Sequence, residues 1–244
     1  MSDPDFEHEI GEDAIPRRIP PLPDMTLADI PPQVGLFPLP GALLLPWGKL
    51  PLNIFEPRYV AMLEDALASH RLIGMIQPID EDEVQFPALA DDPAPALHDI
   101  GCLGRITSFT ERADSTFAVT LSGLARFRVL RELPPTRGYR QARIDTSAFV
   151  GDLVENTAAP LDRAYLMESL KRYFRAHSLR TSWSTLEQME DDALLVVLPM
   201  LVPFTTDEKQ SLLEARSLEA RADLLLALLN EAPEGGASDD PDDE

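Results

Sequence analysis

The chain has 244 residues, 44% of them hydrophobic, so it can bury the core of one large domain or two small ones. Its net charge of −21 counts against a nucleic-acid phosphate backbone as the partner of the whole chain. The single cysteine, Cys102, excludes an internal disulfide and a cysteine-based zinc cluster. We find no apolar stretch of the roughly 20 residues that a membrane helix needs, and no signal-peptide pattern, so we expect a cytoplasmic protein that does not bind membranes.

The negative charge is concentrated at the two ends of the chain. Residues 1–34 carry eight acids and two bases, and residues 231–244 carry seven acids and no base. Acidic, proline-rich segments bury too little apolar surface to offset their chain entropy. We therefore predict a disordered arm at 1–33, which could lie along the domain surface, and a disordered tail at 232–244. Solubility is their simplest role, and docking is the alternative.

Between these ends, the first half of the chain has the pattern of a small β-domain. Short apolar runs bounded by turn residues predict strands at 34–39, 43–46, 50–55, 72–76, 100–106, 117–123, 125–130 and 139–149. Prolines within the early runs indicate sheet edges, because proline cannot donate a hydrogen bond to the ladder. Pro57 predicts the start of a helix that ends near His70. Residues 80–99 hold seven acids and no base, which predicts a solvated loop.

From Pro160 the apolar period changes from that of a strand to that of a helix. Leu166, Leu170 and Phe174 predict one amphipathic helix, and a second is predicted over 185–200 with a capping box from Ser184. Two further helices are predicted, one capped by Thr205 with Glu208 and one capped by Ser217. The predicted class is therefore α+β: a barrel or sandwich at 34–150 followed by a helical bundle at 151–231.

We find no pattern that supports catalysis. The three lysines do not lie in a nucleotide-binding P-loop, and Lys171 and Lys209 are interpreted as solvated helix residues. The four histidines are scattered without metal-ligand spacing, and Cys102 lies in an apolar run typical of a core thiol. We therefore predict no enzyme activity, no cofactor and no metal. An uncharacterised enzyme stays the least supported reading.

Several blocks together resemble the LON domain, the N-terminal substrate-recognition part of Lon-type proteases. They are the apolar run from Val34 with the Leu-Phe-Pro-Leu motif, the Ile-Phe-Glu-Pro-Arg-Tyr motif that ends at Tyr59, residues 101–106, residues 120–129, residues 139–144, and the Asp-Glu-Lys-Gln segment from Asp207 with Arg221. The resemblance covers about 34–230. It implies a PUA-like β-domain, a hairpin at 120–129, a helical bundle, and recognition of substrate rather than catalysis. Because the chain ends at 244, we expect it to stand alone, without the ATPase and peptidase parts.

Six residues are candidates for partner binding: Trp47, Glu56, Arg58, Tyr59, Arg126 and Arg128. Trp47 is interpreted as exposed at a loop tip, beside leucines 43–45, which could be exposed too but fit a core better. Glu56 and Arg58 could bind a partner, although a structural ion pair at the start of the helix explains them as well.

Residues 105–143 carry eight bases and three acids. This region could form a groove for peptide or for the acidic tails, but solvent-exposed hairpin charges are the simpler interpretation. The sequence thus predicts a non-catalytic module that binds unfolded or partly folded polypeptide, with a role as an adaptor or chaperone-like factor in protein quality control. The alternative is an RNA-binding PUA-like module, against which the acidic net charge counts.

Overall fold

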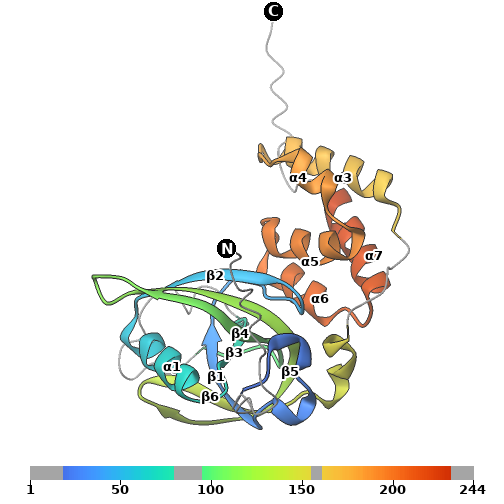
Figure 1. Cartoon of the computed structure of the whole chain (residues 1–244). Coiled ribbons are helices and arrows are strands. Elements are labelled where there is room, and N and C mark those ends of the chain that lie inside the picture. Colours follow the sequence, from blue (N-terminus) through green and yellow to red (C-terminus); the bar gives the residue numbers. More distant parts are fainter. Residues whose placement is uncertain (1–18, 80–94, 155–160, 232–244) are drawn as a thin grey trace, which may run out of the picture.

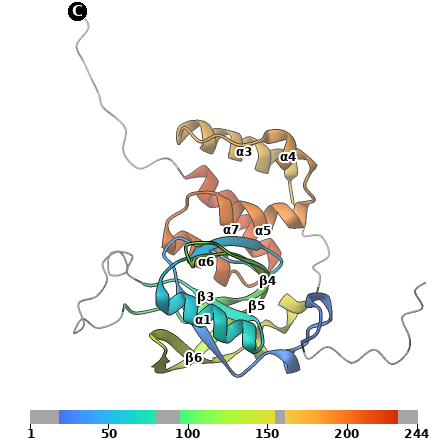
Figure 2. The same ribbon diagram turned by 60° about the vertical axis from the view of Figure 1, so that its left-hand side comes forward.

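The computed structural model describes residues 19–79, 95–154 and 161–231, which form a β-barrel and a helical part joined at one side of the barrel (Figure 1). This arrangement confirms the predicted α+β class. In both ribbon views α6 (Thr206–Glu214) lies next to the barrel, while α3 (Arg163–Ala176) and α4 (Trp183–Gln188) lie farthest from it (Figures 1 and 2). No helix among the described residues is long and apolar enough to cross a membrane.

Within the described residues, six strands form one sheet in the order β2-β5-β4-β3-β1-β6. Their bounds are β1 Gln33–Pro38, β2 Lys49–Ile54, β3 Leu72–Ile76, β4 Ile100–Glu111, β5 Phe117–Thr136 and β6 Tyr139–Asp145. The long strand β5 pairs with β2 and β4 and also with β6, which closes the sheet into a barrel. β1 and β3 are parallel, and the other pairs are antiparallel. Closure leaves β2 at an edge, where Pro51 lies as the proline rule predicts.

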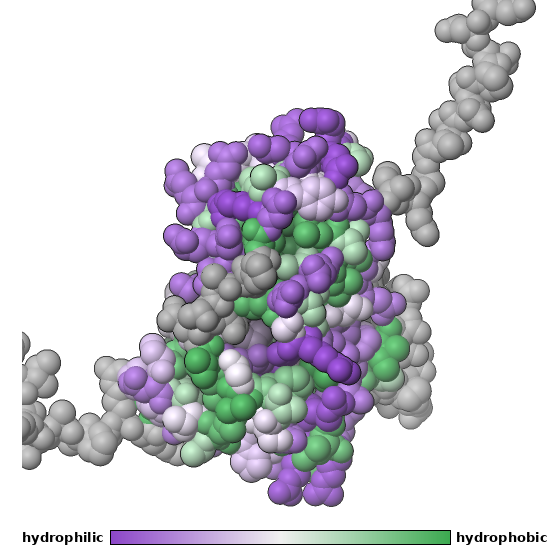
Figure 3. Space-filling view, turned by 90° about the vertical axis from the view of Figure 1, so that its right-hand side faces the viewer, coloured by the Kyte–Doolittle hydropathy of each residue, from purple (hydrophilic) through white to green (hydrophobic). Residues whose placement is uncertain are grey.

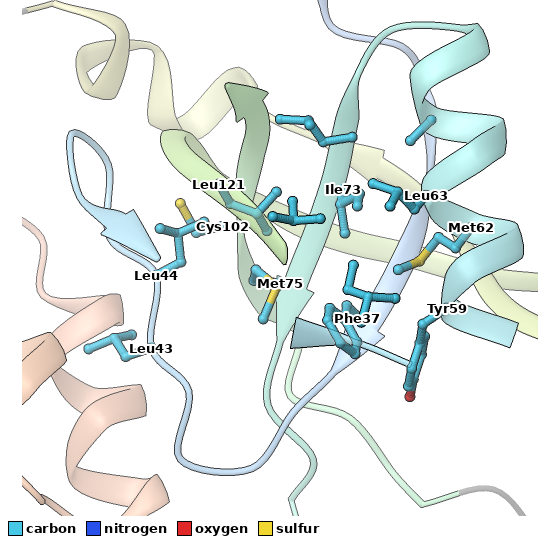
Figure 4. Close-up of a cluster of buried hydrophobic side chains, with 14 of the residues drawn as sticks. Phe37, Leu43, Leu44, Tyr59, Met62, Leu63, Ile73, Met75, Cys102 and Leu121 are labelled. Carbon is cyan, nitrogen blue, oxygen red and sulfur yellow. The ribbon is translucent and has the colours of Figure 1, made fainter. Parts of the chain in front are cut away.

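The sheet is covered on both faces because its strands alternate between two apolar cores. In β1, Phe37 packs with α1 (Pro57–Ala68), whereas Leu36 packs with Phe127 in the other core. Figure 4 shows the first core, in which Leu63 and Met62 of α1 point toward the strands and Leu43 lies beside the ribbon of the helical part. The leucines at 43–45 are all buried there, so the expectation that they are core residues is confirmed.

The segment that holds these leucines is pressed against β5 without being a strand itself. The amide of Trp47 donates to the carbonyl of Gly123 at 2.9 Å, and the amide of Gly123 donates to the carbonyl of Gly48 at 2.8 Å. A side chain at Gly123 would collide with the Leu45 carbonyl, because its Cβ would lie 1.9 Å from that oxygen. The predicted strand at 43–46 is therefore wrong, and the segment is an irregular strap across the barrel.

Two other strand predictions also differ from the structure. The runs at 117–123 and 125–130 belong to the single strand β5, so the expected hairpin within 120–129 is absent. The last strand ends at Asp145 and does not reach residue 149 as predicted. The Asp145 carboxylate accepts hydrogen bonds from the amide and the hydroxyl of Ser147, and these bonds turn the chain. A 3-10 segment, η3 (Ser147–Leu153), follows and carries Asp152 to the side of the barrel.

The helical part is completed by α5 (Asp191–Leu201) and α7 (Leu218–Asn230), with an apolar core of its own. The caps at Thr205 and Ser217 are confirmed by hydrogen bonds from the amides of Glu208 and Ala220 to the two hydroxyls. The predicted helix at 185–200 is two helices, because the chain is extended at Met189. The second helix, α5, begins with an acidic first turn, and negative charge is favourable at a helix N-terminus.

Residues 19–32, expected within the disordered arm, contact the barrel in two short 3-10 turns, η1 (Leu22–Asp24) and η2 (Leu27–Asp29). Met25 between them is buried in the core that contains Phe127. Arg105 donates to the carbonyl of Pro20 at 3.3 Å and to that of His70 at 3.1 Å, which holds this segment in place. Residues 1–18, most of the predicted acidic loop at 80–99, and the tail at 232–244 lie outside the described residues.

Candidate functional site

The junction between barrel and helical part is fastened by a buried ion pair. Arg126 on β5 donates from Nε to Asp152 Oδ2 at 2.9 Å and from Nη2 to Oδ1 at 2.8 Å, and both side chains are 10% exposed. Arg126 Nη1 also donates to the carbonyls of Leu213 at 3.2 Å and Ala215 at 2.7 Å. One side chain thus ties β5 to η3 and to the end of α6. Such a satisfied pair is costly to break, because removing one partner leaves a buried charge.

Further polar contacts join α6 to the barrel. Gln210 donates to the carbonyl of Ile100 at 3.0 Å and accepts a hydrogen bond from Gln77 at 3.1 Å. Lys209 donates from Nζ to the carbonyl of Gly41 at 2.7 Å and is buried. The interpretation of Lys209 as a solvated lysine is therefore wrong. Its side chain lies on the face of α6 toward Gly41, two residues before the strap.

Beside these contacts lies a pocket of about 450 Å³, which we call the junction pocket. The strap and η3 form its barrel side, and α5 with the connection between α6 and α7 forms its helical side. Its lining combines apolar and charged side chains: Trp47, Arg126, Phe149, Asp152, Asp192, Val196, Val197, Arg216, Leu218 and Arg221 among others. Figure 3 looks at the side where the two parts meet, and shows apolar surface on both parts with a hydrophilic band between them.

Trp47 stands at this pocket in an unusual backbone conformation. Its φ is 70°, in the left-handed region that favours glycine. The indole Nε1 donates to the carbonyl of Asp152 at 3.0 Å, which fixes the ring against η3, yet 48% of the residue remains exposed. A large aromatic side chain held in a strained conformation and half open to solvent is a feature of binding sites.

Arg221 on α7 is the most deeply buried cation of the pocket, at 5% exposed. Its Nε donates to the carbonyl of Leu212 at 3.2 Å, which fixes the guanidinium. Burial lowers the pKa of Arg221 to about 10, helped by the positive charge of Arg126, with Asp152 acting in the opposite direction. The group is therefore still charged at neutral pH.

The remaining candidate residues lie outside the pocket lining. Glu56 and Arg58 pair with each other at 2.7 Å and are 41% and 49% exposed, as a structural ion pair at the start of α1 would be. Tyr59 is buried, and its ring packs against Phe37 with the centroids 4.2 Å apart. Arg128 is exposed and lies 3.8 Å from Asp99. Of the six candidates, the structure brings together Trp47 and Arg126.

Several arginines of the basic region 105–143 already have intramolecular partners. Arg137 contacts Glu64 and Asp65 of α1 at 2.6 and 2.7 Å. Arg140 pairs with Glu132, and Arg112 donates to Asn53 at 2.9 Å. Arg105 and Arg126 are buried, so these two side chains are not part of an exposed basic face.

Sequence reasoning missed Asp152, Asp192, Arg216 and Arg221 as pocket residues. Asp152 lies 26 residues from Arg126, and nothing in a single sequence links the two. Arg221 stood in a block that resembles the family, and that was its one signal. An arginine in the first turn of a helix otherwise reads as a surface charge.

The family model of the ATP-dependent protease La (LON) substrate-binding domain matches residues 33–231. The Lon protease of Anaeromyxobacter dehalogenans is 28% identical over 205 residues, and Lon protease 2 of Myxococcus xanthus is 27% identical over 220 residues. The alignments cover 83% and 89% of this chain but 23% and 26% of those proteins, so the chain spans about a quarter of the length of these relatives.

Two solved structures share the fold. The Lon N-terminal domain protein from Xanthomonas campestris aligns with a TM-score of 0.55 and 23% identity, over 80% of this chain and 97% of that one. The N-terminal domain of the Mycobacterium avium complex Lon protease gives a TM-score of 0.54 and 15% identity, over 81% and 97%. Since the family model spans the chain from the start of β1 to the end of α7, the chain belongs to the LON substrate-binding domain family.

Proposed function

We propose that this domain is a non-catalytic module that recognises unfolded or partly folded polypeptide, and that the junction pocket is where the polypeptide binds. The observation that carries the proposal is the half-exposed indole of Trp47, fixed beside a pocket of mixed character. Tryptophan is enriched among the residues that contribute most to protein binding, because it offers a large rigid surface. The family's description as a substrate-binding domain supports the same reading.

The pocket walls fit a ligand of low sequence specificity. Val196, Val197, Phe149 and Leu218 supply apolar surface, which any unfolded segment with an aliphatic or aromatic side chain could cover. The charged residues lie in the same pocket and would orient the backbone or its ends. In a cell, a module of this kind would act as an adaptor or chaperone-like factor in protein quality control.

Two observations support the absence of catalysis. Cys102 is buried in the barrel core, and burial raises the pKa of its thiol well above the usual range, so the thiolate that a nucleophile needs is suppressed. Among the described residues, no group of three or more His, Cys, Asp or Glu side chains is placed to hold a metal ion. We therefore expect neither peptidase nor ATPase activity from this domain.

The test measures the affinity of the chain for a reduced and alkylated protein that stays unfolded, by fluorescence anisotropy of the labelled polypeptide. Trp47→Ala should weaken binding at least about tenfold, as the loss of a central tryptophan does elsewhere. Phe109→Ala is the matched control, because Phe109 on β4 is 52% exposed but does not line the pocket. The affinity of this variant for the unfolded polypeptide should stay within about twofold of the wild type.

Equal affinities for the wild type and Trp47→Ala would contradict the placement of the site. A parallel arm offers structured RNA at two salt concentrations, since phosphate contacts weaken steeply with salt. Retention of RNA in a salt-dependent manner, without retention of the unfolded polypeptide, would overturn the proposal in favour of an RNA-binding module.

A further inference from the structure

The lining of the junction pocket carries more positive charges than negative ones. Five charged side chains line it: Arg126, Asp152, Asp192, Arg216 and Arg221. Both oxygens of Asp152 are taken up by Arg126, so this pair offers no charge to a ligand. Asp192 Oδ1 accepts a hydrogen bond from the amide of Ala193 at the start of α5. Among the ion pairs that the described residues form, none involves Arg216 or Arg221.

Arg221 is the second, independent indication of an anionic ligand. A buried guanidinium is costly unless it is paired with an anion and hydrogen-bonded. Here Nε donates to the carbonyl of Leu212, while Asp152, the carboxylate whose charge acts on Arg221, is already engaged by Arg126. The start of α7 at Leu218 lines the same pocket, and the dipole of a helix favours an anion at this end.

We propose that the junction pocket binds the C-terminal carboxylate of a polypeptide whose last side chain is apolar. The inference rests on the proposed function and adds the chemistry of the ligand's end. Arg221 and Arg216 receive the carboxylate, and Trp47 with Val197 receives the side chain.

The chain end fits better than an internal acidic residue for two reasons. A C-terminal residue carries its carboxylate and its side chain on one Cα, so it meets the arginines and the apolar wall of one small pocket together. A pocket volume of about 450 Å³ is near the lower end of the range for ligand sites. It suits one or two terminal residues better than an internal segment, whose chain must continue out of the pocket at both ends. Capture of a terminal carboxylate is an established mode of peptide recognition.

The experiment compares three synthetic peptides by isothermal calorimetry with the full chain. The first ends in leucine with a free carboxylate, the second is the same peptide with a C-terminal amide, and the third is amidated and carries an internal glutamate. The free acid should bind at least about tenfold more tightly than either amidated peptide, as expected for a charge-assisted pair.

Two substitutions assign the effect to the pocket. Arg216→Gln, at an exposed position, should reduce the preference for the free acid by about threefold or more, while Asp192→Asn should increase affinity for it by a similar factor, since a repelling charge is lost. Arg175→Gln is the matched control, because Arg175 is an exposed arginine of α3 outside the pocket lining. It should leave the preference unchanged.

The outcomes separate this inference from the proposed function. Equal affinity of acid and amide, with binding still lost in Trp47→Ala, would overturn the carboxylate site and leave polypeptide recognition in place. Tight binding of the internal-glutamate peptide would overturn the choice of a chain end. If all three peptides and the unfolded protein fail to bind, both proposals fall.

Discussion

Two arginine–carboxylate pairs of this protein have the same chemistry in opposite surroundings. Arg126 and Asp152 meet at the junction with side chains that are 10% exposed, whereas Arg58 and Glu56 meet at the start of α1 in contact with solvent. The first pair joins segments far apart in the sequence and leads to the pocket; the second joins residues two positions apart. Burial and connectivity, rather than residue type, therefore decide which pair organises the molecule.

The largest loss of stability is expected when Arg126 at the junction loses its charge partner. Asp152→Ala should lower the free energy of unfolding by about 3–5 kcal/mol, because Arg126 stays buried without an anion. Urea unfolding followed by circular dichroism measures the change. The double variant Arg126→Met with Asp152→Leu should recover a large part of it, since no unpaired charge remains. A loss below about 1 kcal/mol in Asp152→Ala would show that the pair does not hold the junction.

The strap is the next place to break the junction. Gly123→Ala places a Cβ 1.9 Å from the Leu45 carbonyl, and the backbone on both sides must move to accept it. We expect a loss of about 2–3 kcal/mol, at the upper end for an overpacked site. Polypeptide binding should weaken as well, because Trp47 is hydrogen-bonded to Gly123.

Gly151→Ala provides the control for the strap. A Cβ at Gly151 meets nothing within 4 Å, although this residue also lines the pocket. Unfolding and binding of this variant should match the wild type. If Gly123→Ala behaves in the same way, the strap does not lie against β5 as described.

A smaller change in stability, with a large change in binding, is expected at Trp47. Trp47→Gly relieves a left-handed backbone conformation that costs of order 1 kcal/mol, and it loses one hydrogen bond of similar worth, so stability should shift by less than about 1 kcal/mol. Binding of the unfolded polypeptide should be lost. Such a division between stability and binding is typical of a functional position.

Arg71→Gly tests whether the relief of backbone strain alone affects polypeptide binding. Arg71 has a φ of 58° just after α1 and does not line the junction pocket. Glycine there should stabilise the fold by about 0.5–1 kcal/mol and leave binding unchanged. Thermal unfolding and the anisotropy assay read the two effects. Equal loss of binding in both variants would trace the effect to backbone relaxation rather than to the indole.

Local patterns predicted what is local in this fold. The helix starting at Pro57, the cap at Thr205 and the edge proline Pro51 each depend on neighbours within a few residues, and the structure has all three. The strap at 43–46 reads as a strand because its leucines are apolar and bounded by proline. They are buried, but Leu45 meets β5 through backbone contacts that do not continue a ladder.

Only part of the candidate site could be predicted from the sequence, because the rest depends on contacts between distant residues. Trp47 was identifiable because a tryptophan beside glycine at a loop tip is rarely packed on all sides. Arg126 was noticed as part of a basic run, yet its role comes from Asp152 and from the carbonyls that end α6. The contacts of β5 with η3 and α6 arise from the tertiary arrangement, and no spacing along the chain encodes them.

The smallest effect is expected at the exposed pair, and it completes the comparison. Glu56→Gln and Arg58→Gln should each change the free energy of unfolding by less than about 1 kcal/mol, because water screens both groups. The ring of Tyr59, 4.7 Å from the Arg58 guanidinium, adds a contact of similar size. A double-mutant cycle in urea measures the coupling, and binding should be unaffected. A coupling above about 2 kcal/mol would mean that burial does not set the strength of these pairs, since the exposed pair would then rival the buried one.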